Sequence, residues 1–401
     1  MSMTTIPAHI PPELVTDVAI ESIPGGDKDP FKAMSSLHEG PDIIWSPRAR
    51  RGGPSWIITR HELIREVLQD SETFSSKGTA GFSALLGEDW DLIPLELDGL
   101  EHSKFRVLLN PIFSPKKIDL LGDSVEGTAS SLVDDILARG ECEFVDEFAR
   151  PFPVAVFLKL FGLPVDEMPR FLKWEDSLLH DSDIEEKQEA ARDIKNYLLG
   201  MAKKRRAEPE DDLISFAVTS QVDGRPLTDD EVLGLCFLLF VGGLDTVASS
   251  LGFFFMHLAK DQEHQRLLRE KPELIPDAIE EILRAHAIVT TVRRLTKDIS
   301  FHGVELKKGE SVVLPMALSS RDEREYECPH KIDFEREAYS HITFSSGPHR
   351  CVGSHLARRE LKIALELWLT RIPQFKIKPG ETPVTHTSAV LGVDYLPLVW
   401  D

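Results

Sequence analysis

One cysteine of this chain stands in a loop whose residue types suit a metal ligand. Cys351 ends the run Phe344-Ser-Ser-Gly-Pro-His-Arg-Cys, just before apolar residues that recur at helical spacing. A thiol at a helix N-terminus ionises more easily because backbone N–H groups face it. A thiolate pushes electron density onto a haem iron so that an O–O bond can break. Gly347 and Gly353 leave no side chain where a flat macrocycle would approach the backbone. The loop therefore predicts a thiolate offered to an iron.

The length of the pattern separates Cys351 from the other cysteines. A lone cysteine is usually a small buried hydrophobe, and this interpretation is kept for Cys142, Cys236 and Cys328. The pattern Phe-x-x-Gly-x-His-x-Cys-x-Gly around Cys351 is too long to arise often by chance.

A second group of reactive types lies in the run Val241-Gly-Gly-Leu-Asp-Thr246. Two glycines inside a helix cost about 1 kcal/mol each relative to alanine, so either something approaches the backbone there or the helix deforms. Asp245 and Thr246 place a carboxylate and a hydroxyl beside them, which suits proton delivery to a buried site. The alternative is a helix–helix contact with a satisfied polar pair.

The elements that would position these groups are mostly helical. We expect a Pro-rich extended arm over 1–50 and a long Gly- and acid-rich loop over 78–94, of the kind that covers a pocket. The expected helices span 61–68, 100–109, 117–138, 154–161, 167–179, 183–206 and one long helix from a Thr228/Glu231 capping box to Ala259. Short strands are expected at 56–59, 299–304, 311–314 and 375–377.

Composition excludes several classes of protein. Lys and Arg number 46 against 67 Asp and Glu, a net charge of −21, which argues against a nucleic-acid binder. Four cysteines without a C-x-x-C pair, and no basic-then-apolar leader, indicate a cytoplasmic protein. The run 232–259 is long enough to cross a membrane. It contains four glycines and Asp245, and we interpret it as a buried core helix of a protein that does not enter membranes.

Together the cysteine loop and the Gly-Gly-x-Asp-Thr run resemble the cytochrome P450 haem-thiolate monooxygenases. The resemblance implies a mostly α fold with a small β region, a triangular α-rich prism with minor antiparallel sheets. It implies one domain over 1–401, with an arm and β-rich part at about 1–60 and a helical haem-binding body at about 61–401. The implied cofactor is haem b, with Cys351 as the iron ligand. Ser345 stands where members often carry glycine.

The same resemblance assigns roles to further residues. Thr246 would hydrogen-bond bound dioxygen, and Asp245 would relay protons to it. Glu281, Arg284 and Arg336 would form a clamp that holds the thiolate loop. Alone, the Glu281/Arg284 spacing would indicate only a weak surface ion pair. Guanidinium groups suit carboxylates, and the residues implied to bind the haem are His102, Arg106, Arg293, Phe344, His349 and Gly353.

Several runs are similar to the soluble bacterial camphor hydroxylase, among them FHGVELKKG at 301–309 and YLPLVWD at 395–401. Members of that branch oxidise compact terpenoids with electrons from a [2Fe-2S] ferredoxin and an NADH-dependent reductase. Trp90 stands where the camphor enzyme has a tyrosine donor, and Thr291 replaces an acid, so a terpenoid, cyclic ether or norisoprenoid is expected rather than camphor. The remaining expected pocket residues are Leu238, Val241, Gly242, Val289 and Val390.

Basic residues would form the ferredoxin-docking face despite the acidic total. They are Lys104, Arg106, Lys116, Lys117, Arg350, Arg358 and Arg359. Two other functions compete with this interpretation. A non-catalytic haem-binding protein needs no Asp245–Thr246 pair, and peroxide-driven haem enzymes usually lack it. The hydrolase patterns G-x-S-x-G, H-E-x-x-H and G-x-x-x-x-G-K-[ST] are missing from the sequence.

Overall fold

The computed structural model describes residues 6–50, 53–336 and 340–401, and most of its elements are helices. The helices are α1 Pro30–Ser35, α2 His61–Gln69, α3 Phe82–Leu85, α4 Gly99–Leu109, α5 Pro115–Asp119, α6 Gly122–Leu137, α7 Pro151–Leu160, α8 Met168–Leu179, α9 Ile184–Ala207, α10 Leu213–Thr219, α11 Asp229–Gly243, α12 Asp245–Lys260, α13 Gln262–Glu270, α14 Ile275–Ala285, α15 Met316–Ser320 and α16 Ser354–Arg371. The strands are β1 Ile43–Arg50, β2 Gly53–Ile58, β3 Phe74–Ser75, β4 Glu141–Glu143, β5 Gln221–Val222, β6 Arg225–Pro226, β7 Thr290–Leu295, β8 Ile299–Phe301, β9 Val304–Leu306, β10 Ser311–Pro315, β11 Phe375–Ile377, β12 Val384–His386, β13 Gly392–Tyr395 and β14 Pro397–Trp400.

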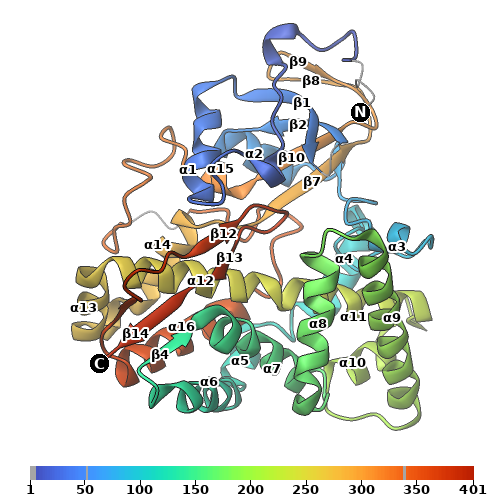
Figure 1. Cartoon of the computed structure of the whole chain (residues 1–401). Helices are drawn as coiled ribbons and strands as arrows, with labels where there is room; N and C mark the ends of the chain where they lie inside the picture. The colour runs from blue at the N-terminus through green and yellow to red at the C-terminus, as the bar shows by residue number, and fades with distance from the viewer. Residues whose placement is uncertain (1–5, 51–52, 337–339) are drawn as a thin grey trace.

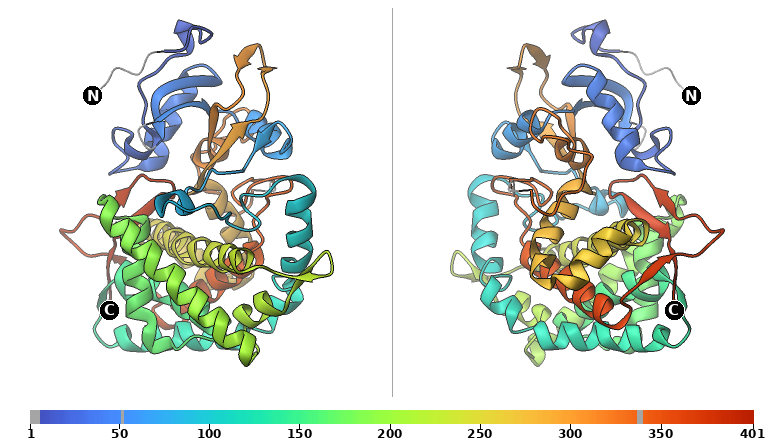
Figure 2. Two further views of the ribbon diagram at one scale, coloured as in Figure 1. Left: turned by 90° about the vertical axis from the view of Figure 1, so that its right-hand side faces the viewer. Right: turned by 90° about the vertical axis from the view of Figure 1, so that its left-hand side faces the viewer.

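The largest sheet joins segments that are far apart in the sequence. Its order is β1-β2-β10-β7-β3. β2 pairs antiparallel with β1 and parallel with β10, and β10 pairs antiparallel with β7. This β-rich part lies at one end of the molecule, and α6 to α10 lie at the other (Figures 1 and 2). The sheet therefore connects the N-terminal region to the segment that carries Thr291 and Arg293.

The long apolar run forms two helices that meet at Leu244. The predicted capping box is present, because the Thr228 side chain accepts from the Glu231 N–H and the Glu231 carboxylate accepts from the Thr228 N–H. α11 ends at the glycine pair, and α12 begins at Asp245. The Thr246 hydroxyl donates to the Gly242 carbonyl at 3.0 Å across this break. Side-chain insertion into the helical hydrogen bonds at glycines is a common cause of such breaks, so the helix deforms at the glycine pair, one of the two alternatives that the sequence left open.

The segment Asp229–Lys260 is long and apolar enough to span a membrane, but two thirds of its most apolar stretch is buried inside the protein. It crosses the middle of the helical part (Figure 1). Burial on nearly every side explains its apolar composition.

Two other predicted elements differ from the structure. The segment 117–138 divides into α5 and α6, and the Arg359 side chain packs directly against Gly122 at the start of α6, where a Cβ would collide with it. The segment 43–50 is a strand and not an extended arm. Its polar residues obscure the alternation that marks strands, while backbone pairing with β2 holds it in the sheet.

Candidate active site

The loop before α16 holds Cys351 through its own backbone. The Cys351 N–H donates to the Phe344 carbonyl at 2.9 Å, and the Arg350 N–H donates to the Gly347 carbonyl at 3.1 Å. Ser345 has φ 65°, in the left-handed region where a side chain costs roughly 1–2 kcal/mol. This conformation explains why glycine is favoured at the position that Ser345 occupies.

The two loop glycines have different surroundings. A Cβ at Gly347 would lie 2.7 Å from the Leu68 carbonyl oxygen, so this glycine allows the loop to pack on the end of α2. Gly347 also has φ 68°. A Cβ at Gly353 would have the Cys351 Sγ as its nearest neighbour, at 3.9 Å, so the space beside the thiol is open there. Only Gly353 therefore fits the expectation of room beside the sulfur.

The electrostatic setting of Cys351 differs from the sequence prediction. Surrounding protein raises the pKa of its thiol by desolvation, although Cys351 as a whole residue is exposed. The Gly353 N–H and the charges of Arg106, Arg358 and Arg350 oppose that rise without overcoming it. Easier ionisation from the helix terminus alone was thus a wrong prediction. A bound cation deprotonates a coordinating thiol outright. A metal ion would therefore produce the thiolate that the helix terminus alone does not.

Glu280 connects the thiolate loop to two helices, and the sequence analysis missed it. Its carboxylate on α14 accepts from Arg358 of α16 at 2.5 and 2.7 Å and lies 3.1 Å from His341 Nε2 in the loop. These hydrogen bonds and charges outweigh burial and lower the pKa of Glu280 to about 2. The Arg358 guanidinium also lies 4.5 Å from the Phe344 ring centroid. The adjacent acids Glu280-Glu281 were the available signal.

The predicted clamp residues lie together. Arg284 and Glu281 form a fully buried bidentate pair with both bonds at 2.8 Å, and Arg336 reaches the same carboxylate at 3.1 Å. Arg284 also donates to three carbonyls, those of Ser320, Pro329 and Lys331. Loss of one partner from such a buried pair leaves an uncompensated charge, so the cluster fixes the chain that leads to the cysteine loop.

Three predicted cofactor-binding residues, His102, Arg293 and His349, form a polar group around Asp98. The rings of His102 and His349 are 4.2 Å apart, and His349 Nε2 lies 3.4 Å from Asp98 Oδ1. Burial and the charge of Arg293 lower the pKa of His349 to about 4, and burial also lowers the pKa of His102. Both imidazoles are therefore neutral N–H donors at neutral pH.

The guanidinium groups of Arg106 and Arg293 form no ion pair with a carboxylate of the described residues. Arg293 is 2% exposed and donates to the Thr291 hydroxyl and the Val292 carbonyl, while Arg106 donates to the Arg350 carbonyl and to Asn110. The ion pairs of the described residues include neither arginine. Desolvation outweighs the charge of Asp98 and lowers the pKa of Arg293 to about 10, so this set suits a further anionic group such as a haem propionate.

The long helices also leave open space for a flat ligand beside Gly242. Gly242 is exposed although the middle of α11 is buried, and nothing lies within 4 Å of a Cβ built there. Together with the exposed Cys351 and the unpaired arginines, this shows that the residues present fit haem b with a thiolate ligand.

Asp245 is buried and has two side-chain partners. Ser249 donates to it at 3.3 Å, and His180 Nε2, from the residue after α8, lies 3.3 Å from the same oxygen. Burial lowers the pKa of His180, but the hydrogen bond and charge of Asp245, with Glu175, raise it overall. Burial and the charge of Asp245 raise the pKa of Glu175 to about 7. His180 and Glu175 were not predicted, because nothing in their sequence surroundings indicates this contact.

Predicted pocket residues occupy several elements. Val289 and Val390 form an isolated antiparallel bridge, and Leu238 and Val241 are partly exposed on α11. The buried Trp90 ring packs 5.2 Å from Phe237. The Trp90 indole N–H donates to Glu88 at 2.7 Å, and Glu88 pairs with Lys195. This N–H is therefore used inside the protein, although Trp90 stands at the position of the substrate-binding tyrosine donor of the camphor enzyme.

The predicted docking cations also divide into two kinds. Lys104 is paired with Glu101 and Asp223, and Arg358 with Glu280. Lys116, Lys117 and Arg350 are exposed, and the ion pairs found among residues 6–50, 53–336 and 340–401 do not include them.

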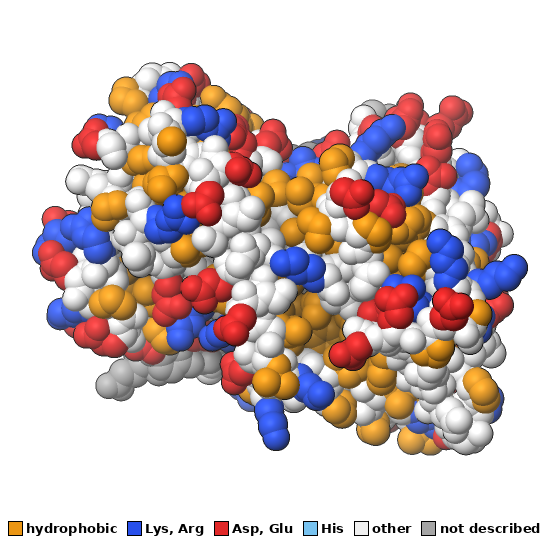
Figure 3. Space-filling view, turned by 90° about the horizontal axis from the view of Figure 1, so that it is seen from below, with side chains coloured by type: hydrophobic (Ala, Val, Ile, Leu, Met, Phe, Trp, Pro, Cys, Tyr) orange, Lys and Arg blue, Asp and Glu red, His pale blue; other side chains and the backbone are white. Residues whose placement is uncertain are grey.

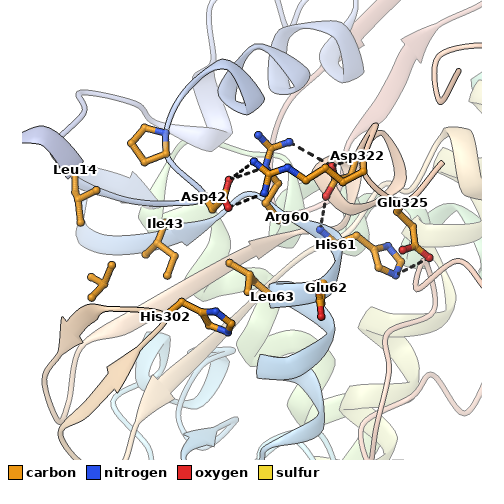
Figure 4. A pocket seen from close by; sticks show the side chains of 13 residues that line it. Leu14, Asp42, Ile43, Arg60, His61, Glu62, Leu63, His302, Asp322 and Glu325 are labelled. Atoms are coloured by element: carbon orange, nitrogen blue, oxygen red, sulfur yellow. Dashed lines mark hydrogen bonds and ion pairs between the residues drawn. The ribbon is translucent and has the colours of Figure 1, made fainter. Parts of the chain in front are cut away.

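A separate surface pocket of about 360 Å³ lies beside β1, the start of α2 and the loop after α15 (Figure 4). Its charges are largely paired: Asp42 binds Arg60 and Arg324, and Asp322 binds Arg60 and the His61 N–H. None of the predicted site residues lines it, so it is distinct from the candidate active site.

Comparisons with known proteins show the family and the fold of the chain. The family model described as Cytochrome P450 matches residues 154–393. The chain is 41% identical over 402 residues to a probable cytochrome P450 127A1 of Sinorhizobium fredii, covering 98% of this chain and 97% of that protein. The crystal structure of cytochrome P450 CYP101C1 matches with a TM-score of 0.91 and 36% identity over 99% and 100% of the two chains. The structure of CYP101J2 matches with a TM-score of 0.90 and 34% identity over the full length of both chains.

Proposed function

Because this chain belongs to the cytochrome P450 family, whose members are monooxygenases that use haem b and O2, we propose that it hydroxylates a compact apolar molecule with electrons from a [2Fe-2S] ferredoxin. The observation that carries the proposal is the combination of the exposed Cys351 with unpaired, buried Arg293 and the Asp245–Thr246 pair. When bound, haem supplies the O–O bond cleavage chemistry. The substrate class is a terpenoid, cyclic ether or norisoprenoid.

In this proposal each residue has a definite task. Cys351 is the iron ligand, and Phe344 and Gly353 lie beside it in the haem-binding loop. The residues that bind the propionates are Arg106, Arg293, His102 and His349. The clamp of Glu281, Arg284 and Arg336 keeps the loop in place. Thr246 holds a proton at its Oγ1 and Asp245 delivers protons to it, because a buried reaction that consumes two protons needs such a path. The apolar groups Leu238, Val241, Val289 and Val390, with Gly242 and Thr291, surround the substrate.

A screen of compact apolar compounds tests the substrate class. A substrate bound beside the haem would change the iron spin state, which is read from the Soret band of the holoenzyme. Hits are then incubated with ferredoxin, its reductase and NADH, and a hydroxylated product is expected. Absence of any hit among terpenoids, cyclic ethers and norisoprenoids would reject this class of substrate.

His180 gives Asp245 a pH-dependent partner. The pKa of His180 is raised in the folded state, so its stabilising contribution is complete below about pH 6.5, the ordinary value for histidine, and is lost as pH rises through the raised pKa. We expect His180→Gln to lower the thermal unfolding midpoint by about 1–2 °C at pH 6, with the difference vanishing toward pH 9. Thermal scans by circular dichroism measure it. His302→Gln, which removes an exposed pair with Glu66, is the control. A difference that stays constant with pH would contradict the role of His180.

Ferredoxin docking is expected at the exposed cations that follow α4 and precede α16. Lys116, Lys117 and Arg350 form no ion pair with the residues that the structure describes, and Val107 and Leu120 are more than 70% exposed nearby in the sequence. On the face opposite the β-rich part, basic and acidic side chains are interspersed, and hydrophobic ones gather in its hollowed middle (Figure 3). The net charge of −21 therefore does not exclude a local contact with an acidic partner.

Charge reversal tests this docking surface. Lys117→Glu with Arg350→Glu is expected to slow ferredoxin-dependent reduction at least about tenfold at low salt, with a smaller effect at high salt. Stopped-flow reduction kinetics at several ionic strengths measure the rate. Lys297→Glu, an exposed cation in the turn after β7, is the control. Equal rates for the double variant and the control would place the partner elsewhere.

Trp90 makes ketones poor substrates in this proposal, because its N–H is bonded to Glu88. Trp90→Tyr adds a hydroxyl donor, and Trp90→Phe is the matched change without one. We expect camphor to bind the Tyr variant more tightly than the Phe variant by about 0.5–1.5 kcal/mol, the value of one hydrogen bond. Spin-state titrations give both dissociation constants. Equal camphor affinities in the two variants, or tight regioselective oxidation of camphor by the unmodified protein, would contradict the role of Trp90.

The protein is proposed to act in the cytoplasm, where its cysteines stay reduced. The support is its composition of four free cysteines and the burial of its most apolar helix.

A further inference from the structure

The corner between α12 and α13 brings two histidines and an aspartate together. His257 lies in the last turn of α12, Asp261 is the N-cap residue of α13, and His264 lies in its first turn. One ligand atom from each residue lies within 4.8 Å of the others. The corner between α12 and α13 stands at one end of the long apolar helices (Figure 1).

The three side chains already point at a common place. His257 Nε2 and His264 Nδ1 are 2.9 Å apart, and Asp261 Oδ2 lies 3.3 Å from the same His264 nitrogen. Tetrahedral Zn²⁺ with bonds of about 2.0–2.1 Å needs its ligand atoms roughly 3.3 Å apart. Small movements of the two rings would therefore admit the ion.

Neighbouring contacts orient the ligands before any ion arrives. The other oxygen of Asp261, Oδ1, accepts the backbone N–H of His264 at 3.0 Å, which fixes the carboxylate with Oδ2 directed at the His264 ring. The His264 ring lies 4.3 Å from the Phe334 ring, and the His257 ring is 6.4 Å from that of His286. Such supporting contacts strengthen metal sites because less ordering is needed on binding.

We propose that His257, Asp261 and His264 form a binding site for a divalent ion that prefers imidazole, with Zn²⁺ as the best match. Two imidazoles and one carboxylate suit Zn²⁺ and disfavour Mg²⁺ and Ca²⁺, which take oxygen ligands. Water would complete the coordination. In the metal-free state His257 Nε2 and His264 Nδ1 share one hydrogen bond, so one of these nitrogens carries the proton. When the ion binds, that proton moves to the other nitrogen of the same ring. No net proton is released when both rings are neutral.

The site would be structural or regulatory and not catalytic. His257 lies 12 residues after Asp245 on one helix, which is about 18 Å along the axis. A bound ion would cross-link the end of α12 to the start of α13. Because α12 begins at Asp245, the ion would restrain the helix that carries the proposed proton relay.

Isothermal titration of the EDTA-treated holoenzyme with ZnCl₂, in excess MgCl₂, tests the site. We expect one saturable Zn²⁺ per chain and a thermal midpoint that rises with zinc. His257→Ala is expected to weaken the binding at least about tenfold. Asp261→Asn is the sharper variant: asparagine still caps α13, so the metal-free midpoint should be unchanged while zinc affinity falls. His302→Ala, from the exposed pair with Glu66, is the control and should bind zinc normally.

Two outcomes would overturn the proposal. One is no saturable zinc binding by the unmodified protein. The other is binding that is equal in the unmodified protein, His257→Ala and Asp261→Asn, which would assign the zinc to other groups and leave the three residues as a hydrogen-bonded cluster. Anomalous diffraction at the zinc edge would locate the ion directly. The zinc titration and the anomalous diffraction do not involve turnover, so both measurements are independent of the proposed monooxygenase function.

Discussion

Cys351→Ser is expected to abolish monooxygenase activity, with product formation falling by more than about 10²-fold. A serine hydroxyl does not provide the electron-rich sulfur on which O–O cleavage depends. The backbone of the loop does not require the thiol, because the Cys351 N–H and the Phe344 carbonyl make their hydrogen bond without it. The variant should therefore fold, and haem content can be measured separately from activity.

The Soret band of the ferrous carbon monoxide complex reads the ligand directly. Cys351→Ser should lose the thiolate-type position, whether or not haem remains bound. Cys328→Ser, a change at an exposed cysteine in another loop, is the control and should keep both spectrum and activity. A thiolate-type spectrum in the Cys351→Ser protein would show that another residue ligates the iron.

Thr246→Ala is expected to separate electron flow from product formation. NADH consumption should continue, while product per NADH falls at least about tenfold and hydrogen peroxide accumulates, since the hydroxyl that holds the proton is missing. Thr246→Ser is the matched control, because it keeps the hydroxyl that donates to the Gly242 carbonyl at 3.0 Å. It should retain most of the coupling. Peroxide and product are quantified in parallel with NADH oxidation.

Asp245→Asn should slow turnover in the same assay. Asparagine can still hydrogen-bond Ser249 and His180, so the local contacts at 3.3 Å can survive while the proton-carrying carboxylate is lost. A fully coupled Thr246→Ala enzyme, or an Asp245→Asn enzyme with unchanged turnover, would assign proton delivery to other groups.

The sequence was sufficient to predict a feature wherever the residues that determine it lie within one short segment. The cysteine loop and the Gly-Gly-Leu-Asp-Thr run identified the family, which the comparisons confirm together with the fold class. The capping box at Thr228 was also predicted correctly, because both of its hydrogen bonds join residues three apart. Backbone geometry fixes such spacings, so residue types are enough to predict them.

Only the tertiary structure decided the contacts between distant segments. Glu280 holds a loop and a helix 61 and 78 residues away, and no local pattern distinguishes it from Glu281 beside it. His180 reaches Asp245 across a gap of more than sixty residues. Arg358 and Trp90 were expected to face a partner or a substrate, yet the Arg358 guanidinium and the Trp90 N–H are bonded inside the protein. A side chain's partner depends on which helices pack together, and spacing along the chain carries no information about that packing.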